Sequence, residues 1–102
     1  MPTVSTALQQ LDRELARARQ TGCGVVKLVH GYGSTGAGGE IRIAAQKRLT
    51  EMAGRGEIRA CIFGEHWAKS DEQAWALINA RPELKQDHDL GRRNQGITIV
   101  VF

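Results

Sequence analysis

The segment GVVKLVHGYGSTGAGGEIR, residues 24–42, decides the fold of this chain. Its first part, residues 24–30, is rich in β-branched side chains and is followed by glycine, which is typical of a β-strand. Residues 31–40 include five glycines and no large side chain except Tyr32. Apolar residues return at helical spacing from Ile41 onward. The segment therefore predicts a strand, a glycine-rich loop and a helix in succession, which is the beginning of an α/β unit.

Apolar residues at helical spacing predict a helix on each side of this strand. The apolar face of the first helix consists of Val4, Leu8, Leu11, Leu15 and Ala18. The apolar face of the second helix consists of Ile41, Ala45, Leu49 and Met52. Thr3 or Ser5 can cap the first helix, and Gly22 can end it. Gly54 and Gly56 are expected to end the second helix.

The remaining segments complete the α/β pattern. Residues 57–63 alternate between polar and apolar, and residues 97–102 are continuously apolar, so both are predicted to be strands. A capping box at residues 70–73 predicts a short helix between them. Residues 83–96 are polar and are expected to form a loop.

These elements predict one domain, residues 1–102, of the α/β class. We expect a two-layer α/β sandwich, in which two main helices lie on a small mixed sheet. The strand–helix–strand connection around the glycine-rich loop predicts that its two strands run parallel. Residues 64–95 form an excursion before the last strand and carry an extra helix. An excursion of this length in a small domain is more often functional than idle.

The composition restricts the class of protein. Of the 102 residues, 41% are hydrophobic and 25% are charged, as in ordinary globular domains, and a net charge of +3 permits an anionic partner without requiring one. Neither a signal-peptide core nor the roughly 20 apolar residues of a membrane span is seen. Cys23 and Cys61 do not have the spacing of metal ligands and are expected to be reduced thiols. We therefore expect a cytoplasmic protein with no membrane partner and no structural metal.

Two familiar phosphate-binding motifs do not explain the glycine-rich loop. Residues 31–36 match G-x-G-x-x-G, but Glu57 opens the next strand, whereas the ribose-binding acid of a dinucleotide site belongs at the far end of that strand. A P-loop requires Gly-Lys-Ser/Thr, and residues 38–40 are Gly-Gly-Glu. Glycine backbone amides and a helix N-terminus still suit a phosphate group, and Arg42 can add a bidentate contact. The loop therefore predicts phosphate binding without naming the ligand.

Three segments resemble the Smr (small MutS-related) domain: KLVHGYG at 27–33, GGEIR at 38–42 and GITIVVF at 96–102. The resemblance covers the chain from the first helix to the end, except for residues 64–90. It implies a two-layer α/β fold and binding of DNA or RNA, in a family related to mismatch repair and recombination. Several members of the family nick or cleave nucleic acid as endonucleases.

The resemblance also implies roles for individual residues. His30 would transfer a proton or contact a phosphate, and Arg42 would neutralise charge on the scissile phosphate; these two are the candidate catalytic residues. Independently of the resemblance, the strand–helix–strand topology predicts that Arg92 and Arg93, just before the last strand, approach the glycine-rich loop and form a second phosphate contact. The full predicted nucleic-acid-binding set is Gly31, Tyr32, Gly33, Ser34, Gly36, Gly38, Gly39, Arg42, Arg92 and Arg93. We expect no cofactor, except a divalent metal ion if the domain is a nuclease.

One departure from the family keeps three functions open. Smr domains carry an earlier strand with a Leu-Asp-x-His motif, which this chain does not contain. The predicted function is therefore nucleic-acid binding; a nicking endonuclease would need its acid from Glu40, Glu65 or Asp89, and a protein-interaction module is the third alternative. Without that strand, a sheet edge would be exposed and could support a homodimer.

The aromatic and histidine residues of the excursion admit ordinary structural interpretations. Trp67 and Trp75 can stack on unpaired bases, but we expect Trp75 to be a core residue because it lies at helical spacing. His88 is expected to be a solvated loop residue, and His66 either a rim contact or a partly buried structural residue.

Overall fold

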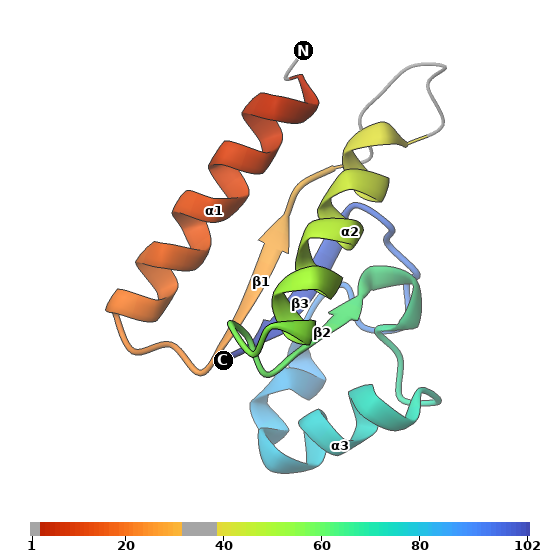
Figure 1. The fold of residues 1–102 in the computed structure, drawn as a ribbon. Helices are drawn as coiled ribbons and strands as arrows, with labels where there is room; N and C mark the ends of the chain where they lie inside the picture. The colour runs from red at the N-terminus through yellow and green to blue at the C-terminus, as the bar shows by residue number, and fades with distance from the viewer. Residues whose placement is uncertain (1–2, 32–38) are drawn as a thin grey trace.

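The computed structural model describes residues 3–31 and 39–102 (Figure 1). Five predicted loop contacts, Tyr32, Gly33, Ser34, Gly36 and Gly38, lie outside the described residues. The helices are α1 (Val4–Gln20), α2 (Glu40–Gly54) and α3 (Glu72–Ala80), with short 3-10 helices η1 (Gly64–His66) and η2 (Pro82–Gln86). The strands are β1 (Val25–Val29), β2 (Ala60–Phe63) and β3 (Ile97–Val101).

Both long helices begin and end where their sequences predict. The Thr3 hydroxyl accepts a hydrogen bond from the Thr6 amide at 3.1 Å, which caps α1. Gly22 follows that helix in the left-handed conformation, with φ of 76°. The short helix α3 is capped by Asp71, one residue later than the predicted capping box begins, and its carboxylate accepts from the Ala74 amide at 2.9 Å.

The sheet has the order β1-β3-β2, and both pairings are antiparallel. Val101 of β3 stands opposite Val25 on one side and Ala60 on the other. Strands β1 and β2 therefore run in the same direction, as predicted, but they are separated by β3 and do not pair. The predicted mixed sheet is in this respect wrong. The reason is that β3 is the most continuously apolar strand and is buried along most of its length, so it occupies the centre.

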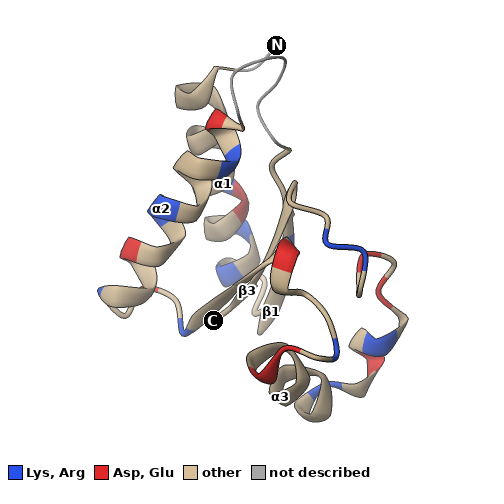
Figure 2. Ribbon diagram, turned by 90° about the vertical axis from the view of Figure 1, so that its right-hand side faces the viewer, with Lys and Arg blue, Asp and Glu red and all other residues tan. Residues whose placement is uncertain are grey.

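The α/β class is confirmed, with α1 and α2 on one face of the sheet (Figure 1). A first core cluster joins these helices to that face and consists of Leu11, Leu15, Leu28, Ala45, Leu49, Ile58 and Val100. A second cluster, on the opposite face, consists of Ile62, Trp67, Ala74, Ile78, Ile97 and Ile99. The excursion thus covers the second face, as Figure 2 shows from the side, and adds a third layer to the two that were expected.

The structure buries Trp67 and leaves Trp75 partly exposed. Trp67 is fully buried, and its indole Nε1–H donates to Asp87 at 2.9 Å. Trp75 is 41% exposed, so its expected place in the core is wrong. On α3, the core positions are taken instead by Ala74 and Ile78, four residues apart.

A polar cluster fixes the end of the excursion to β1. The Lys27 ammonium contacts Asp87 at 3.0 Å and Asp89 at 2.7 Å. Asp89 is 7% exposed and also accepts a hydrogen bond from the Asn94 amide group at 3.0 Å. The hydrogen bond to Asp89 raises the pKa of Lys27, and Lys27 in turn lowers the pKa of Asp89. The segment before β3 is therefore held against the sheet, although it contains no strand.

Candidate nucleic-acid interface

One end of the sheet gathers most of the predicted site residues that the structure describes. Strands β1 and β2 both end there, while α2 and β3 both begin there (Figure 1). His30 follows β1, η1 follows β2, Gly39 precedes α2 and Gly96 precedes β3. We call this region the sheet end. Because parallel strands β1 and β2 terminate together, loops far apart in the sequence become neighbours here.

The start of the glycine-rich loop lies against the segment that precedes β3. The backbone amides of His30 and Gly31 both donate to the Gly96 carbonyl, at 3.0 and 2.9 Å. A Cβ at Gly96 would lie 3.3 Å from the Gly31 Cα, so a side chain there would press on the loop backbone. Gly31 itself has a φ of 76°, which favours glycine. The segment that leads into β3 therefore contacts the start of the predicted phosphate-binding loop at Gly96, three residues after Arg93.

The His30 ring is held at both nitrogens. Nδ1 lies 2.8 Å from the Gly31 carbonyl oxygen, and because a carbonyl only accepts, Nδ1 carries the proton. Nε2, 3.0 Å from the hydroxyl of Thr98, then accepts from that hydroxyl. Burial lowers the pKa of His30, and the nearby Arg42 charge lowers it further. The ring is thus a neutral anchor for the loop start, and proton transfer by His30 would require one of these contacts to break.

Arg42 belongs to a cluster that links α2 with η1. Its Nη1 lies 3.4 Å from the Gln46 side-chain oxygen and 3.8 Å from Glu65 Oε1. Gln46 donates to the same Glu65 oxygen at 2.7 Å. Arg42 and Glu65 are each about a quarter exposed, so the guanidinium remains accessible from solvent. Gln46 has no signal of its own in the sequence beyond its position four residues after Arg42 on one helix face.

Beside this cluster is an open cavity of about 480 Å³, lined by Glu65, His66, Ala68, Ser70, Asp71, Arg93 and Gln95. Arg93 enters it from a turn in which its φ is 54°, an uncommon conformation for a residue with a side chain. Gly64 makes this approach possible, because a Cβ there would lie 1.7 Å from the Asn94 carbonyl oxygen. Glu65 is the residue shared by the cavity and the Arg42 cluster.

The three acids considered for catalysis lie in different surroundings. Asp89 lies on the other face of the sheet, where it forms an ion pair with Lys27 and accepts a hydrogen bond from Asn94. Glu40 is exposed at the first position of α2. Glu65 lies next to Arg42 and lines the cavity together with His66. In residues 3–31 and 39–102, no three His, Cys, Asp or Glu side chains are grouped so that they could hold a metal ion.

No family model, curated protein or solved structure matches the chain. The fold and the site define its class as a small α/β domain with an arginine-bearing polar cavity at one end of its sheet. Among the described helices, none combines the length and apolar character needed to span a bilayer.

Proposed function

We propose that this chain is a nucleic-acid-binding domain of Smr type, which contacts the phosphate backbone of DNA or RNA at the sheet end. The observation that carries the proposal is the contact of His30 and Gly31 with Gly96. This contact supports the proposal because Gly31 begins the loop predicted to bind phosphate, and Gly96 lies three residues after Arg93 in the segment of the second predicted contact. Contacts from two separate loops can follow a phosphate backbone, whereas one loop alone offers a single anion site.

The arginines of the sheet end suit this ligand. Arg42 is held by Gln46 and Glu65, so its guanidinium is positioned before a ligand binds. Arg93 faces the adjoining cavity. A phosphate that approaches Arg42 must also come close to the Glu65 carboxylate. We therefore expect Glu65 to weaken binding unless it takes part in chemistry.

Binding across a salt series tests the proposal. With labelled single- and double-stranded oligonucleotides of DNA and RNA, affinity should fall steeply as salt rises. Arg42→Ala should weaken binding to any sequence and reduce the slope of log K against log salt by about one. Lys85→Ala, on exposed η2, is the control and should leave both unchanged. Salt-independent affinity, or an unaltered slope in Arg42→Ala, would remove the sheet end from the interface.

A second candidate function is a nicking endonuclease, favoured by the position of Glu65 and His66 in one cavity. These residues would supply the acid and base that the family places on its earlier strand, and a divalent metal ion is the expected cofactor. Glu65→Gln separates the two functions. If the domain only binds, the variant should bind more tightly because a negative charge beside Arg42 is gone. If it cleaves, the variant should lose nicking of supercoiled plasmid or RNA while it retains binding.

We also propose a homodimer through the β1 edge and a cytoplasmic location. Strand β1 is an outer strand of the described sheet, and Val29 near its end is 70% exposed. Both cysteines are free thiols, which is consistent with a reducing compartment. Sedimentation equilibrium at high concentration tests the dimer; a monomer throughout would contradict it.

A further inference from the structure

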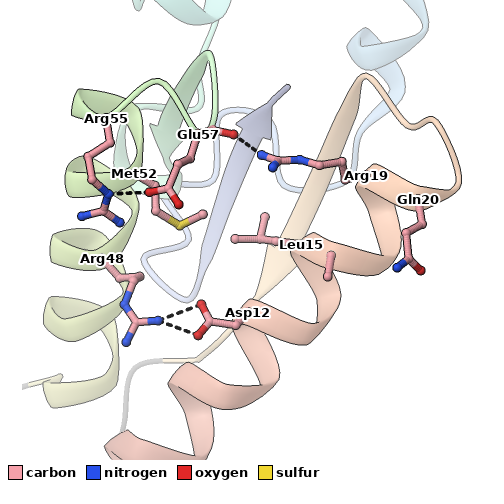
Figure 3. A pocket seen from close by; sticks show the side chains of 9 residues that line it. Asp12, Leu15, Arg19, Gln20, Arg48, Met52, Arg55 and Glu57 are labelled. Carbon is pink, nitrogen blue, oxygen red and sulfur yellow. Dashed lines mark hydrogen bonds and ion pairs between the residues drawn. The ribbon is translucent and has the colours of Figure 1, made fainter.

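A second surface feature lies away from the sheet end, between the carboxyl-terminal halves of α1 and α2 (Figure 3). It is a cavity of about 530 Å³ with apolar side chains from both helices, Leu15 and Ala16 from α1 and Met52 from α2. Polar and charged side chains form its rim, namely Asp12, Arg19, Gln20, Arg48, Arg55 and Glu57. We call it the helix groove. The proposed nucleic-acid interface uses none of these residues.

Two of the rim arginines reach across the helix groove. Arg48 of α2 contacts both carboxylate oxygens of Asp12 on α1, at 2.7 and 2.6 Å. Arg19 of α1 donates to the backbone carbonyl of Glu57 (Figure 3). Asp12 is 52% exposed, and exposed pairs of this kind typically contribute only about 0–1 kcal/mol. Arg48 can therefore exchange Asp12 for another carboxylate at little cost.

Arg19 also separates the helix groove from a second cavity, of about 600 Å³. That cavity shares Arg19 and Glu57 with the groove and adds Arg59, Ile58 and Phe102. The Arg19 guanidinium carbon lies 5.3 Å from the centre of the Phe102 ring. The two cavities thus meet at Arg19 and Glu57 and form one trough, whose rim carries four arginines together with Asp12 and Glu57.

We propose that this trough docks a short acidic amphipathic helix of a partner protein. Apolar side chains of the partner would rest on Ala16, which is exposed, and on Met52, which is partly exposed. Its carboxylates would replace Asp12 as the partner of Arg48 and Glu57 as the partner of Arg55. From Asp12 to Gln20 the groove spans about 12 Å of α1, which is roughly two turns of a docked helix. Methionine in the floor adapts to side chains of different shape.

The apolar residues of the helix groove favour an acidic peptide over nucleic acid as the ligand. Sugar and phosphate groups are bound mainly by charged and hydrogen-bonding groups. Ala16 and Met52 offer neither, but they do offer apolar surface to a helix that also carries carboxylates, above the buried Leu15. The position of the arginines around an apolar centre is therefore complementary to an acidic amphipathic helix.

The experiment uses the full chain, labelled with ¹⁵N, and a synthetic helical peptide of ~14 residues, about four turns. The peptide carries leucines on one face and glutamates on both sides of that face. We expect saturable binding, with amide shifts concentrated at Leu15, Ala16 and Met52. The Arg48→Glu/Arg55→Glu variant should bind at least about tenfold more weakly, equivalent to about 1.4 kcal/mol. The control Lys69→Glu/Lys85→Glu reverses two charges on exposed residues outside the groove and should not alter the affinity.

Several results would overturn the proposal. They are the absence of binding, equal binding of a scrambled peptide of the same composition, or shifts confined to the sheet end. Equal affinity of the double variant would also exclude the helix groove as the peptide site. Displacement of the peptide from the groove by a second copy of the chain, or by an oligonucleotide, would assign the groove to that other occupant. If the double variant loses its thermal transition, Arg55→Ala decides alone, because Arg55 is 55% exposed and exposed ion pairs such as those with Glu51 and Glu57 typically contribute only about 0–1 kcal/mol.

Discussion

At the scale of single residues, glycines and buried polar groups determine how the loops of this domain meet. Gly64 and Gly96 allow backbone segments to approach more closely than any side chain would permit. The His30 ring and the Thr98 hydroxyl form a hydrogen bond at the start of the glycine-rich loop. The resemblance to the Smr domain singled out His30, but the sequence gave no sign of Thr98, because that contact joins residues 68 positions apart.

Replacing Gly64 should therefore be costly. In Gly64→Ala, the new Cβ would lie 1.7 Å from the Asn94 carbonyl oxygen and 2.8 Å from that of Ile97, so the backbone must move. We expect a loss of about 1–3 kcal/mol in the free energy of unfolding, measured by urea denaturation. Gly54→Ala is the matched control, since nothing lies within 4 Å of its Cβ position. It should be neutral or stabilising; equal losses in both variants would contradict the packing described here.

His30 should make stability depend on pH. Its pKa is lowered in the folded state by burial, so the unfolded chain binds more protons below the ordinary value of 6.5. The stability associated with neutral His30 is present above pH 6.5 and is lost as the pH falls through the folded-state pKa. His30→Gln should flatten this part of the profile, as measured by urea denaturation from pH 7.5 to about 5. The same slope in the variant and the parent would assign it to other groups.

At the scale of elements, the excursion behaves as part of the core although much of it is irregular. Its helix α3 contributes Ala74 and Ile78 to the second core cluster, and η2 is followed by the acids that bind Lys27. Most predicted apolar positions of α1 and α2 are buried, because helical spacing is a local property that the sequence displays directly; on α1, however, Val4 and Leu8 are only partly buried and Ala7 is buried without having been predicted. Nothing local indicated that Lys27, in the middle of an apolar strand, would pair with acids 60 and 62 residues away.

Removing the Lys27 charge should loosen the end of the excursion before the rest of the domain. Lys27→Met leaves Asp87 and Asp89 without a cation, and Asp89 is almost buried, so we expect a loss of about 1–3 kcal/mol. Hydrogen exchange should accelerate for the amides of residues 87–96 more than for those of α1. Lys85→Met, on exposed η2, is the control for loss of a lysine. Uniform acceleration through the whole chain would show that the excursion does not open separately.

At the scale of the whole molecule, two arginine-bearing surfaces lie at opposite ends of the helical layer. Arg42 is in the first turn of α2 and Arg55 caps its last, a separation of about 20 Å along the helix. The proposed interface and the helix groove therefore share the element α2 but none of their lining residues.

Variants at the two ends should act independently. Arg42→Ala should weaken only oligonucleotide binding, and Arg48→Glu/Arg55→Glu should weaken only binding of the acidic peptide. The combined variant should show the sum of both free-energy changes within about 0.5 kcal/mol, because the altered side chains have no common partner. Anisotropy titrations with both ligands measure this, and strong coupling would indicate one continuous surface.

The sequence by itself determined the local structure: two amphipathic helices, three strands, the glycine-rich loop and the α/β class. Periodicity and turn chemistry express these features within a few residues. Only the tertiary structure decided that β3 lies between β1 and β2, that Trp67 is buried rather than Trp75, and that Glu65 adjoins Arg42. These outcomes depend on which apolar surfaces cover one another across the whole chain. The meeting of Gly31 with Gly96, on which the proposed function rests, is likewise a consequence of strand order, which no local pattern records.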